Sequence, residues 1–267
     1  RRVLFRSDKT RKALDNVSMD FNKGNIIGII GSNGSGKSTL FNNLMGILKS
    51  TEGEILYNGE QIKYDKKSLY NLRKEVGIVF QDPEKQIFYS MVYDDIAFAL
   101  RNIGIDEKTI KERIHTALEA VNGLQFIDRP VHNLSFGQKK RVAIASVVAM
   151  ENKLVLLDEP TAGLDPISTR AIVDIIKGLN KRGVKIVISS HDMNLIYEIC
   201  DYVYVLNQGV LINEGTREEV FINEEKIDEA GLELPWLVKL HKNMGLPLFT
   251  REEDLYSYWN HREQKTV

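Results

Sequence analysis

The chain has 267 residues, 43% of them hydrophobic, and a net charge of −1. This length allows one large domain, with or without an appendage. Because basic residues do not outnumber acidic ones, nucleic acid is not expected to be the main partner. The single cysteine, Cys200, excludes an intrachain disulfide framework and fits a reducing compartment. No signal peptide is visible, and the longest uncharged apolar run, residues 142–150, is too short to cross a bilayer. We expect a soluble chain that reaches a membrane only through a partner.

The first residues are unusual. Residues 1–7, Arg-Arg-Val-Leu-Phe-Arg-Ser, read like a translated sequencing adapter, and we do not expect them to belong to the fold. A genuine basic N-terminal strand is the alternative. Residues 12–21 alternate between apolar and polar side chains, which predicts a half-buried strand. Residues 22–25, Asn-Lys-Gly-Asn, predict a turn into the next strand.

A phosphate-binding motif organises the chain. Residues 26–30, Ile-Ile-Gly-Ile-Ile, predict a buried strand, and apolar residues at helical spacing over residues 40–48 predict a helix. Between them lies G-x-x-x-x-G-K-[ST], whose glycines let backbone N–H groups converge on a phosphate at a helix N-terminus. A merely tight turn is the alternative. The candidate nucleotide-binding residues are Ser32, Asn33, Gly34, Ser35, Gly36, Lys37, Ser38 and Thr39.

Strand and helix signals alternate along the rest of the chain. The predicted elements are a hairpin around Asn58-Gly59, a helix at 68–74, strands at 76–80, 154–158 and 184–190, a helix at 168–179, and a hairpin around Gln208-Gly209. Residues 91–150 carry mainly helical periodicity, clearest in Ile110, Ile114, Leu118 and Val121. These signals predict a three-layer α/β core with a mostly parallel sheet and an inserted helical stretch.

Polar residues follow three of the predicted strands. Asp158 and Glu159 come after an apolar run, at the strand end where ligands of open α/β sheets bind. Asp158 is a candidate magnesium ligand together with Ser38, and Glu159 is a candidate base that polarises a water. His191 and Gln81 follow two other strands, as contacts to a γ-phosphate or metal would. The alternatives are that Asp158 and Glu159 form an acidic turn, that His191 is a structural histidine and that Gln81 is a loop amide.

A second anion site is predicted at residues 134–138, Leu-Ser-Phe-Gly-Gln, because Ser135 is a good N-cap for the helix that follows. An ordinary N-cap is the alternative. In this order, the motifs resemble those of the ATP-binding subunits of ABC transporters. The resemblance runs from about Ala13 to Phe221 and also includes residues 162–165, Ala-Gly-Leu-Asp.

The resemblance implies that two such subunits sandwich two ATP molecules head to tail. Ser135, Gly137 and Gln138 of one subunit would then contact the nucleotide held by Lys37 of the other. Glu159 would be the general base, with His191 and Gln81 beside the γ-phosphate and Asp165 linking the subunits. It also implies a P-loop NTPase core of the ABC type with ATP and Mg²⁺ as cofactors.

One position departs from the family pattern, because Phe136 replaces the first of two usual glycines. We call residues 134–138 the signature. The signature, the stretch 80–88 and the tail 231–235 look like the cobalt-type branch of energy-coupling-factor importers. We therefore expect an ABC ATPase domain over residues 8–218, with a helical subdomain at about 91–150, and a small helical extension over residues 219–267. The extension is either a dimer contact or a cap on its own core. The family's adenine-stacking aromatic is assigned to no residue.

The function implied is an ATP-hydrolysing subunit that powers uptake of a transition-metal ion such as cobalt, or of a vitamin, through separate membrane subunits. Its partners would be a second ATPase subunit, identical or paralogous, and the membrane-spanning subunits at the cytoplasmic face. A soluble ABC ATPase acting on nucleic acid or ribosomes is the rival, but such proteins usually have two cassettes or long heptad arms. A nucleotide kinase is a weaker rival, since it needs an acceptor site in place of residues 134–138.

Overall fold

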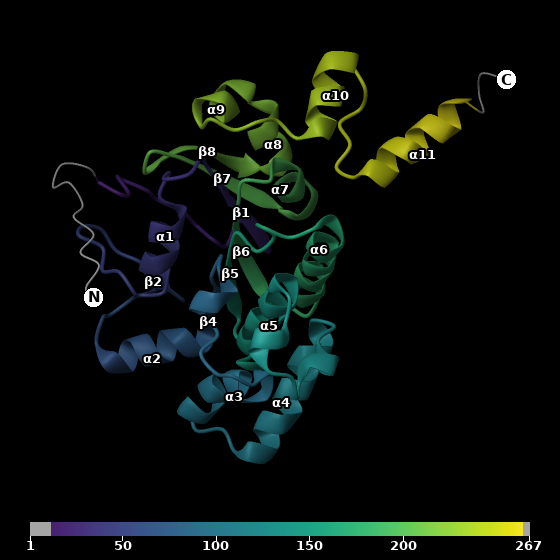
Figure 1. Ribbon diagram of the computed structural model, residues 1–267. Helices are drawn as coiled ribbons and strands as arrows, with labels where there is room; N and C mark the ends of the chain where they lie inside the picture. The colour runs from purple at the N-terminus through teal and green to yellow at the C-terminus, as the bar shows by residue number, and fades with distance from the viewer. Residues whose placement is uncertain (1–11, 264–267) are drawn as a thin grey trace.

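A six-stranded sheet runs through the middle of the molecule, as the computed structural model shows for residues 12–263 (Figure 1). Its strands are β1 (Ile26–Ile30), β4 (Val76–Val79), β5 (Leu154–Asp158), β6 (Lys185–Ser190), β7 (Tyr202–Asn207) and β8 (Val210–Thr216). The order across the sheet is β4-β5-β6-β1-β7-β8, and every neighbouring pair is parallel except β7 and β8. The predicted mostly parallel sheet is confirmed.

Helices lie on both faces of this sheet (Figure 1), and the described α-helices are eleven in number. They are α1 (Lys37–Leu44), α2 (Lys66–Glu75), α3 (Val92–Asn102), α4 (Glu107–Ala120), α5 (Phe136–Ala149), α6 (Pro166–Lys181), α7 (Met193–Ile199), α8 (Arg217–Ile222), α9 (Glu224–Glu229), α10 (Trp236–Met244) and α11 (Glu252–Glu263). Alternate residues of β1 join two different clusters of buried side chains: Ile26 and Ile30 join one, Ile27 and Ile29 the other. A strand covered on both faces must be apolar throughout, which explains its isoleucines.

Both predicted hairpins are present. β2 (Leu56–Tyr57) pairs antiparallel with β3 (Glu60–Gln61) across Asn58 and Gly59, whose φ angles are 52° and 79°. Two positive φ angles in a row are the requirement of the tight hairpin turn that Asn-Gly favours. The β7–β8 hairpin turns at Gln208 and Gly209 in the same way, with φ angles of 46° and 84°.

The prediction of a strand over residues 12–21 is wrong. Asn16 has a φ of 52°, which breaks an extended run, and the Tyr204 hydroxyl bonds both the N–H and the C=O of Asp20 in place of a neighbouring strand. Val17, Met19 and Phe21 still pack on the core at alternate positions, which is the pattern that prompted the prediction. The suspected adapter, residues 1–7, lies outside the described residues.

The stretch 91–150 is helical, as predicted, and α3, α4 and α5 lie together at one end of the molecule (Figure 1). Ile110, Ile114 and Leu118 are fully buried in their shared face. Helix α5 also lies against β4, where a Cβ atom added to Gly77 would come within 2.3 Å of Val147 Cγ1. Only glycine permits this close approach.

The C-terminal helices α8, α9 and α10 gather at the opposite end, and α11 extends away from the rest of the molecule (Figure 1). Thr216 and Glu219 form the predicted capping box of α8. The domain boundary at residue 218 stays a prediction. Cys200 ends α7, fully buried against Gly28 of β1, and burial raises the pKa of its thiol well above the usual value. In the part of the chain that the structure describes, every helix is too short or too polar to span a membrane.

Candidate functional site

The phosphate loop lies between β1 and α1, at the carboxyl edge of the sheet. Gly36 is the N-cap of α1 with a φ of 107°, and a Cβ atom there would lie 2.8 Å from the carbonyl oxygen of Ala13. This position therefore requires glycine for both its backbone angle and its space. The loop places the N-terminus of α1 beside the end of β1, the arrangement that binds phosphate.

Lys37 curls back over this loop. Its ammonium donates to the carbonyl oxygens of Gly31, at 2.6 Å, and Ser32, at 3.1 Å, and the residue is only 7% exposed. Burial lowers the pKa of Lys37, while the carboxylates of Glu159 and Asp158 oppose that shift. A partly desolvated cation held inside the loop is placed to attract a phosphate strongly.

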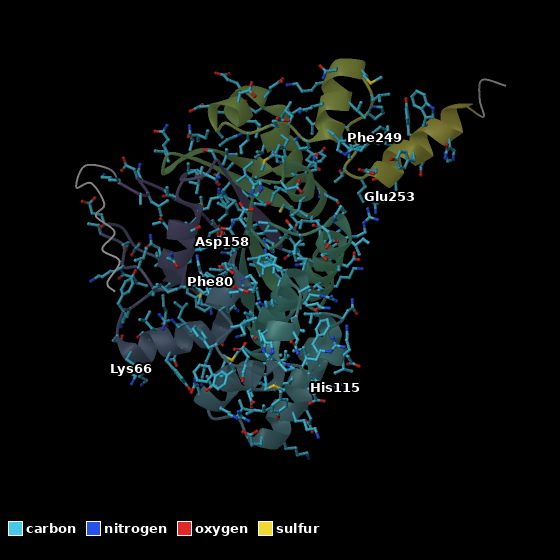
Figure 2. All side chains as sticks on the ribbon, viewed as in Figure 1. Lys66, Phe80, His115, Asp158, Phe249 and Glu253 are labelled. Carbon is cyan, nitrogen blue, oxygen red and sulfur yellow. The ribbon has the colours of Figure 1, made fainter. Side chains whose placement is uncertain are left out.

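Asp158 joins the end of β5 to the phosphate loop. Its Oδ2 accepts from the Ser38 hydroxyl at 3.0 Å, and its Oδ1 accepts from the Ser189 hydroxyl at 2.5 Å. The labelled Asp158 lies near the middle of the molecule (Figure 2). The neighbouring side-chain oxygens of Ser38 and Asp158 suit Mg²⁺, which prefers oxygen ligands. This ion usually takes only one or two ligands from the protein and the rest from phosphates and water.

Glu159 and His191 form a pair at the same edge. Glu159 Oε2 lies 2.8 Å from His191 Nδ1, because the parallel pairing of β5 and β6 places Asp158 opposite Ser189. Glu159 is 6% exposed, whereas the His191 side chain is 62% exposed. The buried carboxylate is therefore held by an imidazole that opens to solvent, an arrangement suited to handling a proton next to a bound phosphate.

Gln81 lies two residues beyond β4 and is exposed at this edge. The neighbouring Gln86, which sequence reasoning missed, folds inward instead. Its amide accepts from Phe80 N–H at 3.1 Å and donates to the Ala143 carbonyl at 3.2 Å, which ties this loop to α5. Ser189, the bridge to Asp158, was also missed, although a serine at a strand end was a visible signal.

The predicted second anion site stands at the N-terminus of α5. Ser135 caps the helix and Gln138 returns a bond to the Ser135 N–H at 2.9 Å, so the capping box is complete. The Phe136 ring lies beside Gly163, where an added Cβ would meet it at 3.4 Å. Among residues 12–263, no hydrogen bond or ion pair joins residues 134–138 to the phosphate loop. The phosphate loop and residues 134–138 thus belong to different parts of the fold, the β1–α1 connection and the start of α5.

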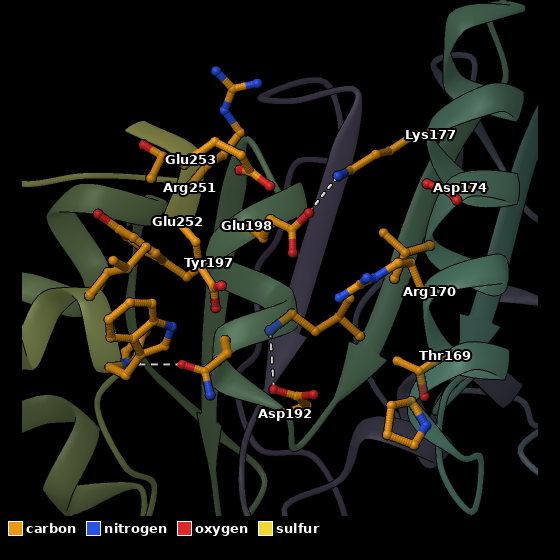
Figure 3. A pocket seen from close by; sticks show the side chains of 18 of the residues that line it. Thr169, Arg170, Asp174, Lys177, Asp192, Tyr197, Glu198, Arg251, Glu252 and Glu253 are labelled. Atoms are coloured by element: carbon orange, nitrogen blue, oxygen red, sulfur yellow. Dashed lines mark hydrogen bonds and ion pairs between the residues drawn. The ribbon is translucent and has the colours of Figure 1, made fainter. Parts of the chain in front are cut away.

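A further hollow of about 670 Å³ lies between α6, α7, α10 and the start of α11 (Figure 3). Charges of both signs line it, including the Lys177–Glu198 ion pair. Asn194 on α7 accepts from the Trp236 N–H at 2.9 Å, so this region is where the C-terminal helices attach to the core. It lies apart from the phosphate loop and contains none of its residues.

Comparisons with known proteins agree with this geometry. Residues 14–162 match the model of the ABC transporter family. The chain is 47% identical to a cobalt import ATP-binding protein of Salmonella typhimurium, over 94% of this chain and 92% of that protein. It is 45% identical to an energy-coupling factor transporter ATP-binding protein of Methanocaldococcus jannaschii, over 89% and 85%. The solved structure of cbiO1 from Clostridium perfringens, described as part of an ABC transporter complex, matches with a TM-score of 0.74 and 42% identity, over 86% and 92%.

The fold, the phosphate loop and these relatives together define an ATPase, and the chain belongs to the ABC transporter family. Within that family it is an ATP-binding subunit of the cobalt and energy-coupling-factor type.

Proposed function

We propose that this chain hydrolyses ATP to power an energy-coupling-factor importer whose membrane-spanning subunits are separate proteins. The observation that carries the hydrolytic part is the Glu159–His191 pair, 2.8 Å apart, next to the linked Ser38 and Asp158. The names of the similar proteins support the transport part, since they are import or energy-coupling-factor subunits. The chain then works at the cytoplasmic face of the membrane, held there by its partners.

In the proposed mechanism, residues 32–39 bind the phosphates through backbone N–H groups and the Lys37 ammonium. Ser38, Asp158 and Gln81 would hold Mg²⁺, and the ion would supply positive charge that offsets the charge of the phosphates. Glu159 accepts a proton from the attacking water, and His191 orients that carboxylate while its exposed side faces the γ-phosphate. Catalysis is then mainly positioning and electrostatics on an in-line attack.

Two copies of the ATPase subunit are required in this proposal. The chain has one phosphate loop and one signature, and these are separate within the subunit, so a second signature must complete each site. Ser135, Gly137 and Gln138 of one copy would contact the nucleotide on Lys37 of the other. A two-fold homodimer would give two equivalent sites, and a paralogous second subunit is the alternative.

An exposed aromatic patch, formed by Phe88, Tyr89 and Phe98, is the proposed contact with the membrane subunits. Phe88 is 79% exposed, and the rings of Tyr89 and Phe98 lie 5.3 Å apart. The Asp95 carboxylate, itself buried, accepts from the N–H groups of Phe88 at 2.8 Å and Tyr89 at 3.1 Å. The patch is thus presented on a fixed backbone, which suits a short amphipathic helix of a membrane subunit.

The proposed solute is a transition-metal ion such as cobalt, or a vitamin. Solute contacts belong to membrane subunits, so the test is uptake by cells that carry the complete transporter. Labelled cobalt and labelled vitamins would be offered to cells with the normal chain or with Glu159→Gln. If the variant takes up one of these solutes more slowly than the normal chain does, the proposal is supported. If the variant takes up every solute at the normal rate, the proposal is contradicted.

The oligomeric state is tested with the same variant. Glu159→Gln should form an ATP-dependent homodimer, because blocked hydrolysis traps the closed state. The measurement is the mass by light scattering with and without Mg-ATP, and a monomer at saturating ATP would favour a paralogous partner. Co-purification with a hydrophobic membrane protein separates this function from the rival, a soluble ABC ATPase acting on nucleic acid or ribosomes.

A further inference from the structure

The structure contains a buried cation that the mechanism above does not use. Lys140 lies on α5, five residues after Ser135, and is 1% exposed. Its ammonium donates to the carbonyl oxygens of Glu159, at 2.8 Å, and Pro160, at 2.9 Å, and lies 5.6 Å from the centre of the Phe136 ring. Lysine is almost never this buried unless its charge has partners, so a specific role is expected.

Burial lowers the pKa of Lys140 to about 8, although the nearby carboxylates of Glu159, Asp158 and Asp82 oppose the shift. An apolar side chain of similar length would fill the same space without this cost of desolvation. What the ammonium adds is a pair of directed hydrogen bonds to two successive carbonyl groups. Its role is therefore to be sought in the backbone that it holds.

That backbone is unusual at Glu159, which has a φ of 46° in the left-handed region that side chains other than glycine rarely adopt. The surrounding contacts hold Glu159 in this conformation. Its N–H donates to the Ser189 carbonyl at 3.1 Å, its C=O accepts from Lys140 and from the Ala162 N–H, and its carboxylate meets His191. Of these partners, only Lys140 belongs to α5, the helix that the signature residues 134–138 begin; we call α5 the signature helix.

We propose that Lys140 is a positioning residue that holds Glu159 in its catalytic orientation and links that orientation to the signature helix. This inference rests on the proposed role of Glu159 as the base. Because Ser135 and Lys140 lie on one rigid helix, a nucleotide that binds at Ser135 shifts the ammonium and, through it, the Glu159 backbone. Small displacements of a base cost much of its rate, so the two nucleotide sites of a dimer become coupled through α5.

The test is Lys140→Met in the full chain, which keeps the length of the side chain and removes its donors. We expect kcat for Mg-ATP to fall about 30-fold, with KM and ATP affinity within twofold of normal, because the phosphate loop is untouched. The neighbouring Lys139→Met is the matched control. The half-buried Lys139 pairs with the exposed Glu84 and not with the Glu159 backbone, so its loss should leave kcat unchanged.

A double variant separates positioning from general destabilisation. If Lys140 acts through Glu159, then adding Lys140→Met to Glu159→Gln should cause no further loss of single-turnover rate. A normal kcat in Lys140→Met, or an equal additional loss in the double variant, would overturn the proposal. A raised KM with a lowered melting temperature would also overturn it. If Glu159→Gln alone hydrolysed ATP normally, the base assignment itself would fail, and this proposal with it.

Discussion

Two regions of this molecule use burial in opposite ways. At the carboxyl edge of the sheet, Lys37, Asp158 and Glu159 are charged, yet each is less than 10% exposed and bonded to a neighbour. In the aromatic patch, Phe88 is apolar and 79% exposed. Buried charges are costly unless a network pairs them, and exposed aromatics are costly unless a partner covers them. The contrast fits the proposal that the buried edge performs the chemistry and that the aromatic patch serves assembly.

The largest expected effect concerns the buried edge. Glu159→Gln keeps the shape of the side chain but removes the base, so turnover should fall at least ~100-fold while ATP still binds. The measurement is steady-state ATPase rate beside equilibrium nucleotide binding. Turnover near the normal rate would remove Glu159 from its proposed role.

The second effect concerns the aromatic patch. Phe88→Glu should weaken assembly with the membrane subunits about 30-fold, because it places a charge where an apolar ring would be buried. Nucleotide affinity should not change. Leu56→Glu is the control, since Leu56 is also apolar and 56% exposed but lies on the β2–β3 hairpin. Equal co-purification of both variants would contradict the placement of the patch.

A third variant returns to the buried edge. Lys37→Ala should weaken ATP binding about tenfold, which is ~1.4 kcal/mol, because it deletes a positive charge beside the phosphates. Titration with a fluorescent nucleotide measures this, with Lys49→Ala as the control for an exposed lysine outside the loop. An unchanged affinity would show that Lys37 does not contact the nucleotide.

The smallest effect sharpens the comparison, because Asp95 is a buried charge that serves the aromatic patch. Asp95→Ala removes the acceptor for the Phe88 and Tyr89 N–H groups and should cost ~1–2 kcal/mol of unfolding free energy. Assembly should weaken only about fivefold. Asp95→Asn retains one acceptor oxygen and should keep most of the unfolding free energy and most of the assembly. Urea unfolding measures the first and co-purification the second. No difference between the two variants would exclude the hydrogen bonds as the cause.

Much of the candidate site could be predicted from the sequence because parallel strands end at one edge. Asp158, Glu159 and His191 follow apolar runs, so knowing that those runs are parallel strands is enough to bring them together. The phosphate loop was predictable because its spacing is local. Ser38 and Asp158, 120 residues apart, meet for the same topological reason.

The rest depends on contacts that no local pattern encodes. Lys140 follows the signature like any helix-surface lysine, and only the packing of α5 on the end of β5 buries it. The strand predicted over residues 12–21 failed because alternation reports which side chains are buried, not whether the backbone has a strand beside it. Asn16 and the Tyr204 hydroxyl decided that question.

The burial of Cys200 makes this chain convenient for site-specific labelling. It is the one cysteine in the sequence, and its thiol is enclosed at the end of α7 with a raised pKa, so little reactive thiolate is exposed to a maleimide. A cysteine introduced at an exposed position such as Ser257 on α11 would then carry the label almost alone. Spin labels there would report the distance between two copies as ATP is added, without first removing a native thiol.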